Sequence, residues 1–407
     1  MDIATYIREM GERARAAAAE LAKLSTDDKN KALLAIADAL EAHRGEIASA
    51  NAADVERAKS AGISPAMLDR LTLTDARFGA MVEGARHVAS LPDPVGETIW
   101  TRERPSGITI RKVRVPFGVV AVVFESRPNV FVDTAALCLK TGNAVILRGG
   151  KEAIGSNSAI AKAVRGALEP LGLGDAVQFV DIADHAAVTE IVRAVGLVDV
   201  AIPRGGERLI RAMCEAALVP VLKHYKGVCH VYVDESADLD MALRIIDNAK
   251  TQRPGVCNAM ECLLVDSRIA GDFLPKVRAW AAERGVVLHE EGEGATPEWE
   301  REFLALEMNV KVVDGCAAAV AHINGYGSHH SDCIVANDEA KAAEFLRDVD
   351  SAAVYHNVST RFTDGAEFGM GAEIGISTDK LHARGPMGLE ELTTYKYQVT
   401  GDGVTRK

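Results

Sequence analysis

The sequence predicts an α/β protein with two blocks of parallel β-strands, and three observations support this prediction. Between residues 115 and 252, short apolar segments such as VVAVVF and NAVILR alternate with alanine-rich segments, the pattern of a doubly wound parallel sheet. The alternation starts again after QRPGVCNAM (252–260), with ECLLVD, VVLHE, VKVVD, DCIVAND and AAVYHN. The first 95 residues carry apolar side chains at three- and four-residue spacing, which predicts helices.

Two β-prone segments stand outside both alternating blocks. Residues 96–114 alternate β-branched and charged positions around Pro105-Ser106-Gly107, which predicts a two-stranded ribbon with a tight turn. Residues 392–399, LTTYKYQV, form an isolated β-prone run after Gly385-Pro386. We expect both segments to pair away from the two sheets, where they can contact another subunit.

Composition excludes several classes of protein. The chain has 407 residues, enough for two or three domains, and its 46 Lys and Arg against 58 Asp and Glu give a net charge of −12, which disfavours nucleic acid as a partner. The longest apolar run, residues 115–124, is too short to cross a bilayer and contains Pro116 and Gly118. Charged residues in the first 24 positions predict a helix and not a secretion signal.

The seven cysteines include no Cys-x-x-Cys pair and match neither a disulfide framework nor a zinc site. They suggest a reducing compartment, so we expect a cytoplasmic protein. Nucleotide-binding fingerprints are also missing, since no G-x-G-x-x-G follows a strand and no Walker motif occurs. A bound dinucleotide would therefore use unconventional contacts.

Cys257 is the candidate nucleophile. It lies in the loop Arg253-Pro254-Gly255-Val256-Cys257-Asn258, between a helix that ends near Lys250 and the strand ECLLVD. The irregular neighbours and the nearby Arg253 describe an electropositive site that favours a thiolate. The alternative is a buried structural cysteine, which suits Cys262 in the apolar strand better.

Three strand ends offer ligand contacts, because α/β folds bind ligands at the carboxyl ends of their strands. After VVAVVF, Asn129 could donate to an oxyanion or could instead cap a helix. Arg148-Gly149-Gly150-Lys151 and Arg204-Gly205-Gly206 offer backbone amides and cations for phosphate or ribose, or are ordinary turns.

Two polar runs lie further along the chain. Residues 320–335, VAHINGYGSHHSDCIV, contain adjacent His329 and His330, which should point apart, so we predict no metal site. Arg361, in the run NVSTRFTDG, could bind a substrate carboxylate or form a surface ion pair.

Five of these runs, in order along the chain, resemble the γ-glutamyl phosphate reductases of the aldehyde dehydrogenase superfamily. They are VPFGVVAVVFESRPNV, ILRGGKEA, QRPGVCNAMECLLVD, VAHINGYGSHHSD and STRFTDG, and the similarity covers essentially the whole chain. The resemblance implies an aldehyde dehydrogenase-like fold. It further implies a Rossmann-like NADPH-binding domain (1–95 and 115–252), an α/β catalytic domain (253–365) and a small β element for oligomerisation (96–114 and 388–407).

The resemblance also implies an activity, the reduction of L-glutamyl 5-phosphate by NADPH to L-glutamate 5-semialdehyde and phosphate, in proline biosynthesis. It assigns Cys257 as the nucleophile that forms a thioester and Asn129 as the oxyanion donor. The superfamily binds its cofactor without G-x-G-x-x-G. The residues expected to contact NADPH are Arg148, Lys151, Gly205, Gly206 and Glu307. Arg253, His330 and Arg361 are candidates for the substrate.

One departure from the superfamily supports reduction over hydrolysis. Hydrolytic members carry a glutamate that activates water, whereas the comparable stretch, residues 222–227, is Leu-Lys-His-Tyr-Lys-Gly and has no carboxylate. We expect a homo-oligomer that can associate with a separate glutamate 5-kinase, because the kinase domain is absent. The alternatives are a reductase of another acyl phosphate or of an acyl-CoA, and a non-catalytic scaffold of the same fold.

Overall fold

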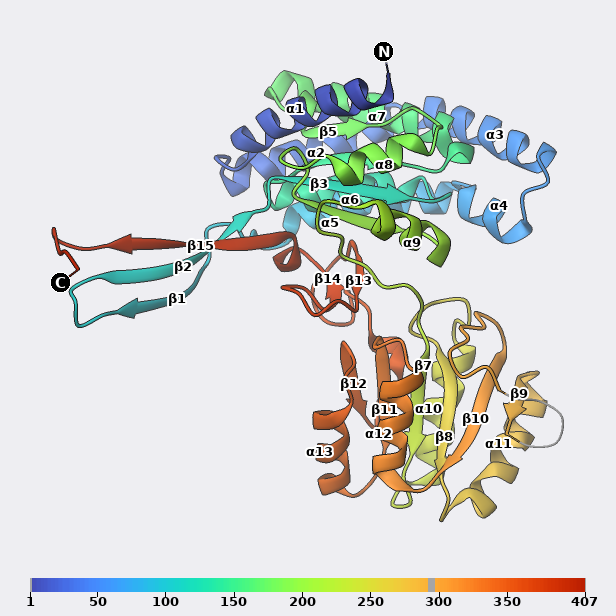
Figure 1. The fold of residues 1–407 in the computed structure, drawn as a ribbon. Coiled ribbons are helices and arrows are strands. Elements are labelled where there is room, and N and C mark those ends of the chain that lie inside the picture. Colours follow the sequence, from blue (N-terminus) through green and yellow to red (C-terminus); the bar gives the residue numbers. More distant parts are fainter. Residues whose placement is uncertain (1, 292–296, 407) are drawn as a thin grey trace. The chain divides into compact units, whose positions relative to one another are not determined.

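The structure is a computed structural model that describes residues 2–291 and 297–406. The chain divides into two compact units (Figure 1). The first unit consists of Met1–Lys223, Met370–Gly375 and Met387–Lys407, and the second of His224–Gly369 and Ile376–Pro386.

The first unit is built on a four-stranded parallel sheet with strand order β5-β4-β3-β6. Its strands are β3 (Val119–Phe124), β4 (Ala144–Arg148), β5 (Val177–Phe179) and β6 (Val200–Arg204). Every residue of β3 and β4 is buried, because helices cover both faces of the sheet (Figure 1). This confirms the predicted parallel sheet with its continuous apolar strands.

The helices of the first unit follow the predicted periodicity. They are α1 (Ile3–Leu21), α2 (Thr26–Ala42), α3 (Arg44–Ser60), α4 (Pro65–Leu71), α5 (Asp75–Ser90), α6 (Asn129–Lys140), α7 (Ile154–Leu168), α8 (Ala186–Arg193) and α9 (Glu207–Ala216). The side chains of Asp2, Ser25, Ser64 and Thr74 accept backbone N–H groups at the starts of α1, α2, α4 and α5. Such caps fix where each helix begins.

A separate three-stranded antiparallel sheet extends as an arm from the first unit (Figure 1). It contains β1 (Thr98–Glu103), β2 (Thr109–Pro116) and the C-terminal strand β15 (Thr393–Thr400), which pairs with β2. The predicted ribbon and the pairing of the last strand outside both parallel sheets are thus confirmed. The exposed Tyr395 and Tyr397 suit a contact with another subunit, and the homo-oligomer stays a prediction.

The second unit is built on a six-stranded parallel sheet with strand order β12-β11-β7-β8-β10-β9. The strands are β7 (Cys229–Val233), β8 (Met260–Asp266), β9 (Val287–Glu290), β10 (Glu307–Val313), β11 (Ser331–Val335) and β12 (Ala353–His356). A two-stranded sheet of β13 (Gly375–Ser377) and β14 (Gly385–Met387) follows.

Two helices pack on each face of the six-stranded sheet. Side chains from α10 (Leu239–Thr251) and α11 (Ala270–Arg284) pack with Val231 and Val233. Those from α12 (Gly315–Tyr326) and α13 (Glu339–Asp348) pack with Tyr232 on the opposite face. Successive side chains of β7 point to opposite faces of the sheet, so they contribute to two separate hydrophobic cores.

The boundary between the units differs from the predicted one. The sequence pattern extends the first α/β block to residue 252, whereas the division in the structure falls after Lys223. The reason is pairing, because β7 forms ladders with β8 and β11 of the second sheet and α10 packs beside it. Among the described residues, no helix combines the length and apolar character needed to cross a membrane.

A buried ion pair joins α10 to β8 in the second unit. Lys250 Nζ donates to Glu261 Oε2 at 2.8 Å, and both side chains are 0% exposed. Burial lowers the pKa of Lys250 and raises the pKa of Glu261 to about 7. The two residues flank the loop of residues 252–259, so the pair fixes both ends of that loop.

Breaking this pair should strongly destabilise the second unit. Lys250→Met leaves the Glu261 carboxyl buried without its cation, and we expect a loss of about 3–5 kcal/mol in the free energy of unfolding. The double variant Lys250→Met/Glu261→Leu should recover most of that loss, because no buried charge remains, although the Leu304 amide loses an acceptor. Urea unfolding followed by circular dichroism measures both values.

The matched control is Lys276→Met, since Lys276 pairs with Asp240 on the surface at 3.7 Å. An exposed pair contributes about 0–1 kcal/mol, so this variant should unfold close to the wild type. A loss in Lys250→Met no larger than in the control would contradict a structural role for the buried pair.

Candidate active site

Cys257 lies in the loop that connects α10 to β8, as predicted. The side chain is half-buried, whereas Cys138, Cys229 and Cys333 are buried and their thiols have raised pKa values because burial disfavours the thiolate. Those three cysteines stay protonated and take the structural role. Cys257 is half-buried in a loop, and this position permits reaction with a ligand from solvent.

The segment that precedes β7 contacts the backbone of Cys257. A Cβ atom placed on Gly227 would lie 1.7 Å from the carbonyl oxygen of Cys257, so only glycine fits there. The Cys229 thiol donates to the same carbonyl oxygen at 3.2 Å, and Glu302 Oε1 accepts the Gly227 amide at 2.8 Å. These contacts fix the main chain that carries the nucleophile.

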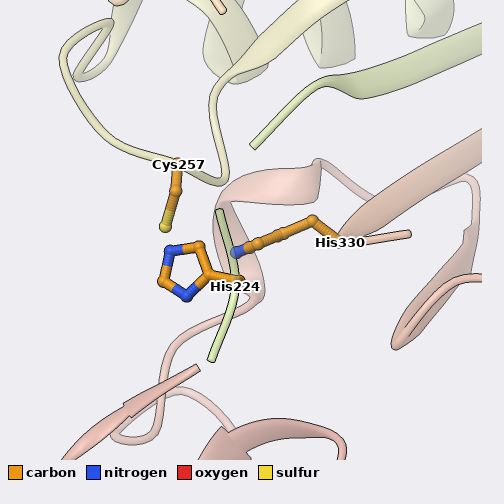
Figure 2. Close-up of side chains that lie close together, drawn as sticks. All are labelled: His224, Cys257 and His330. Carbon is orange, nitrogen blue, oxygen red and sulfur yellow. The ribbon is translucent and has the colours of Figure 1, made fainter. Parts of the chain in front are cut away.

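Figure 2 shows Cys257 Sγ directed at the imidazole of His224, with His330 beside it. One ligand atom from each of the three side chains lies within 4.8 Å of the other two. His224 Nδ1 lies 2.8 Å from the carbonyl oxygen of Ile376. Because a carbonyl only accepts, Nδ1 carries the hydrogen and the neutral ring has its lone pair on Nε2. His224 is thereby prepared to accept the thiol proton.

His330 is fully buried and packs edge-on against His224, with ring centroids 5.4 Å apart. Its Nδ1 is 2.8 Å from Ser331 Oγ, and among the described residues its Nε2 has no hydrogen-bond partner. Burial and, after it, the charge of His224 lower the pKa of His330 to about 3. Because the His330 ring is buried and neutral, it is better suited to contact Cys257 than to bind the substrate as a cation. His329 turns away, toward the Asp350 carbonyl oxygen, as predicted.

Arg361 binds the nucleophile loop. Its Nε donates to Gln252 Oε1 at 2.8 Å and its Nη1 donates to Asn258 Oδ1. Asn258 Nδ2 donates in turn to the carbonyl oxygen of Thr363 at 2.9 Å. Arg253 is exposed in the same loop, and its charge lowers the pKa of Arg361 after the larger effect of burial. The run STRFTDG thus supports the loop of Cys257, and its Arg361 adds a second guanidinium group to that of Arg253 in the loop.

Glu307 lies at the start of β10, with Oε2 3.2 Å from His289 Nε2. Glu302 instead accepts the amide of Gly227, the residue that lies against the Cys257 carbonyl. The role of Glu307 toward the cofactor stays a prediction. Glu302 and His224 were not singled out from the sequence. For His224 a signal existed, because it lies in the stretch that corresponds to the active-site glutamate of hydrolytic superfamily members.

In the first unit, the predicted strand ends meet at one edge of the sheet. Phe124 pairs with Arg204 and Val123 with Arg148, so β3, β4 and β6 end together. Glu152, in the turn after β4, accepts the Ser126 hydroxyl at 2.5 Å and joins two of these ends. Gly205 and Gly206 are exposed at the third, directly before α9.

Arg148 and Lys151 lie at this edge in different environments. Arg148 is buried and its Nη2 donates to the Ala183 carbonyl oxygen at 3.0 Å, whereas its buried Nε has no partner among the described residues. Lys151 begins a short 3₁₀ helix (Lys151–Ala153) and is exposed. An unpartnered buried N–H, exposed turn amides and an exposed ammonium suit an anionic ligand.

Asn129 is the first residue of α6 and makes no capping hydrogen bond, so the alternative of a helix cap is wrong. Its Nδ2 donates to Asp133 Oδ2 at 2.9 Å. Burial raises the pKa of Asp133 to about 6, although Asn129 and then Arg204 oppose that rise. The amide that we expect to act on an oxyanion is therefore oriented by a carboxyl that changes charge near pH 6.

Asp133 should make the stability of the first unit depend on pH. The folded state holds the proton of a carboxyl with a raised pKa, so the contribution of Asp133 to stability is greatest below the ordinary pKa of 3.8 and is lost as pH rises to about 6. We expect Asp133→Asn to lack this fall. Unfolding free energies of wild type and variant between pH 4 and pH 7.5 measure the difference, and two parallel curves would contradict the assignment.

The comparisons agree with this geometry. Residues 4–291 match the profile of the aldehyde dehydrogenase family. The γ-glutamyl phosphate reductase of Thermotoga maritima is 44% identical, with a TM-score of 0.96 over 98% of this chain and 100% of that one. The enzyme of the same name from Saccharomyces cerevisiae is 32% identical, with a TM-score of 0.56 over 98% of each chain.

An acetylating aldehyde dehydrogenase from Geobacillus thermoglucosidasius shares only 18% identity, with a TM-score of 0.69 over 100% of this chain and 98% of that one. This likeness shows the fold alone. The family is shown by the match over residues 4–291 and by the two more similar structures. The chain belongs to the aldehyde dehydrogenase family and is similar within it to the γ-glutamyl phosphate reductases.

Proposed function

We propose that this protein reduces L-glutamyl 5-phosphate to L-glutamate 5-semialdehyde with NADPH and releases phosphate, as a step of proline biosynthesis. The observation that carries the proposal is the half-buried Cys257, directed at the oriented imidazole of His224. The similarity to γ-glutamyl phosphate reductases over 98% of the chain supports the substrate.

The first step is attack by Cys257 on the acyl phosphate. His224 Nε2 accepts the thiol proton, the sulfur–carbon bond forms, and the bond between the carbonyl carbon and the phosphate oxygen breaks. Phosphate leaves and a thioester remains on Cys257. The resemblance assigns Asn129 as donor to the negative oxygen of this step, and one such donor typically lowers a barrier by about 3–4 kcal/mol.

A nicotinamide cofactor, when bound, supplies the hydride that reduces the thioester carbonyl. The sheet edge of the first unit fits such an anionic group through Arg148, Lys151 and the amides at Gly205 and Gly206. The sulfur–carbon bond of Cys257 then breaks, the aldehyde leaves, and the thiolate is restored. We infer NADPH over NADH from the two cations after β4, which suit an additional phosphate.

Two guanidinium groups support an acyl phosphate as the substrate. Arg253 and Arg361 repel each other, since the charge of Arg253 lowers the pKa of Arg361. A doubly charged phosphate relieves this repulsion and forms charge-assisted hydrogen bonds with both groups. The association with a glutamate 5-kinase and the cytoplasmic location stay predictions from the sequence.

The reverse reaction tests the proposed function directly. We expect the protein to oxidise glutamate 5-semialdehyde with NADP only when phosphate or arsenate is present, because the thioester needs an attacking anion. NADPH absorbance follows the rate in the presence of phosphate, arsenate, coenzyme A or no addition. Turnover without an anion, or turnover that needs coenzyme A, would assign a different reaction.

Replacing the nucleophile should abolish the reaction. Cys257→Ala removes the only atom that can carry the thioester, and we expect a fall in kcat of at least about 10⁴-fold. NADPH binding, measured by fluorescence, should stay close to the wild-type value. Cys214→Ala, at a half-buried cysteine on α9, is the matched control and should keep its activity. Equal activity of the two variants would exclude the thioester mechanism.

A further inference from the structure

The cluster of His224, Cys257 and His330 has the composition of a metal site. Two imidazoles and one thiol are ligands that Zn²⁺ prefers, and three protein ligands with one open position are typical of accessible zinc sites. Their ligand atoms lie within 4.8 Å of one another. A tetrahedral zinc ion needs its ligand atoms roughly 3.5 Å apart, so small side-chain rotations close the site.

Both histidines are oriented as metal ligands usually are. A ligating histidine normally engages its second nitrogen with an acceptor, which leaves the first nitrogen for the metal. His224 Nδ1 is held by the Ile376 carbonyl oxygen, and His330 Nδ1 lies 2.8 Å from Ser331 Oγ. The Nε2 atoms of both rings are therefore the ones that would coordinate an ion, and Figure 2 shows both rings beside Cys257 Sγ.

The buried nitrogen of His330 is a second, independent observation. Its Nε2 lies in a fully buried side chain and, within the described part of the chain, makes no hydrogen bond. A buried polar atom without a partner costs free energy that a ligand can recover. Cys257 and His224 are only partly buried, so an ion can reach the cluster from solvent.

From these observations we infer that His224, Cys257 and His330 bind a zinc ion through Nε2, Sγ and Nε2, and that zinc inhibits the protein reversibly. On binding, the Cys257 thiol releases its proton and its sulfur donates a lone pair to zinc. That pair is then unavailable for attack on an acyl carbon. The inhibition rests on the proposed function, whereas the binding does not.

The chain offers an internal control for this inference. His230, Cys262 and His322 form a second cluster with ligand atoms within 4.8 Å, and all three side chains are buried. His230 and Cys262 are neighbours on β7 and β8, and His322 lies on α12. An ion reaches this cluster only through an opening of the core, so we expect the first cluster to bind zinc under native conditions.

The experiment measures zinc binding to the purified full chain without substrate. The protein is kept reduced with a phosphine, because thiol reductants bind zinc, and Zn²⁺ is titrated in competition with a chromophoric chelator. We expect one tight zinc ion per chain. Cys257→Ala and His224→Gln should each lower the affinity at least about 100-fold, since changes even to outer-shell partners cost 10–100-fold. His322→Gln should bind zinc as the wild type does.

Cobalt provides a spectroscopic check on the same variants. Co²⁺ bound to a thiolate absorbs in the near ultraviolet by charge transfer, so this band should appear in the wild type and in His322→Gln and be absent from Cys257→Ala. Circular dichroism confirms that each variant is folded. Loss of zinc in His322→Gln with retention in Cys257→Ala, or no zinc binding at all, would overturn the inference.

The two proposals fail separately. If zinc binds as expected but no substrate is turned over, the metal site stands and the proposed function is wrong. If the protein turns over glutamate 5-semialdehyde and zinc neither binds nor inhibits, the function stands and the metal site is wrong. Addition of a chelator should restore the activity of zinc-treated protein, which separates reversible binding from damage to the thiol.

Discussion

The geometry of the active site depends on the buried ion pair between Lys250 and Glu261. It connects the last turn of α10 to the second residue of β8, at 2.8 Å and away from water. The chain between these two residues carries Cys257. A loop with fixed ends samples few conformations. The conformational entropy of the loop that carries the nucleophile is therefore lost when the second sheet folds. Glu261 Oε1 also accepts the Leu304 amide, which ties the segment that contains Glu302 to the same point.

From that fixed base, the site is completed by segments far apart in the sequence. Gly227 lets the main chain of the 222–227 stretch approach Cys257, and Asn258 connects the loop to Thr363. Ser331 Oγ lies 2.5 Å from Thr363 Oγ1, which links the position of His330 to the same segment. Displacement of one segment therefore moves the others. A rigid constellation of this kind suits chemistry in which a base must face a nucleophile before the substrate arrives.

Local patterns were sufficient for most of the fold but not for the site. Continuous apolar runs predicted β3, β4 and β8, and the irregular residues around Cys257 predicted an accessible loop. The boundary at Lys223 could not be found in this way, because the apolar strand β7 is joined to its sheet by pairing with β8 and β11. His224 was missed for a related reason, since its closeness to Cys257 and its tautomer are set by the Ile376 carbonyl, 152 residues away. Arg361 was singled out from the sequence, but its hydrogen bonds to Gln252 and Asn258 are tertiary and could not be predicted from the run NVSTRFTDG.

The arrangement that activates the thiol also exposes it to a competitor. Imidazole nitrogens beside the Cys257 sulfur can accept the thiol proton. The same nitrogens, together with the sulfur, can bind a soft cation. The positive charges of Arg253 and Arg361 decide between the two outcomes. They attract the doubly charged phosphate of the substrate and oppose a divalent cation, whose binding is favoured by the thiolate charge and by the buried nitrogen of His330. Because the same guanidinium groups act with opposite sign on phosphate and on zinc, we expect the site to favour the proposed substrate over the metal without any change of shape.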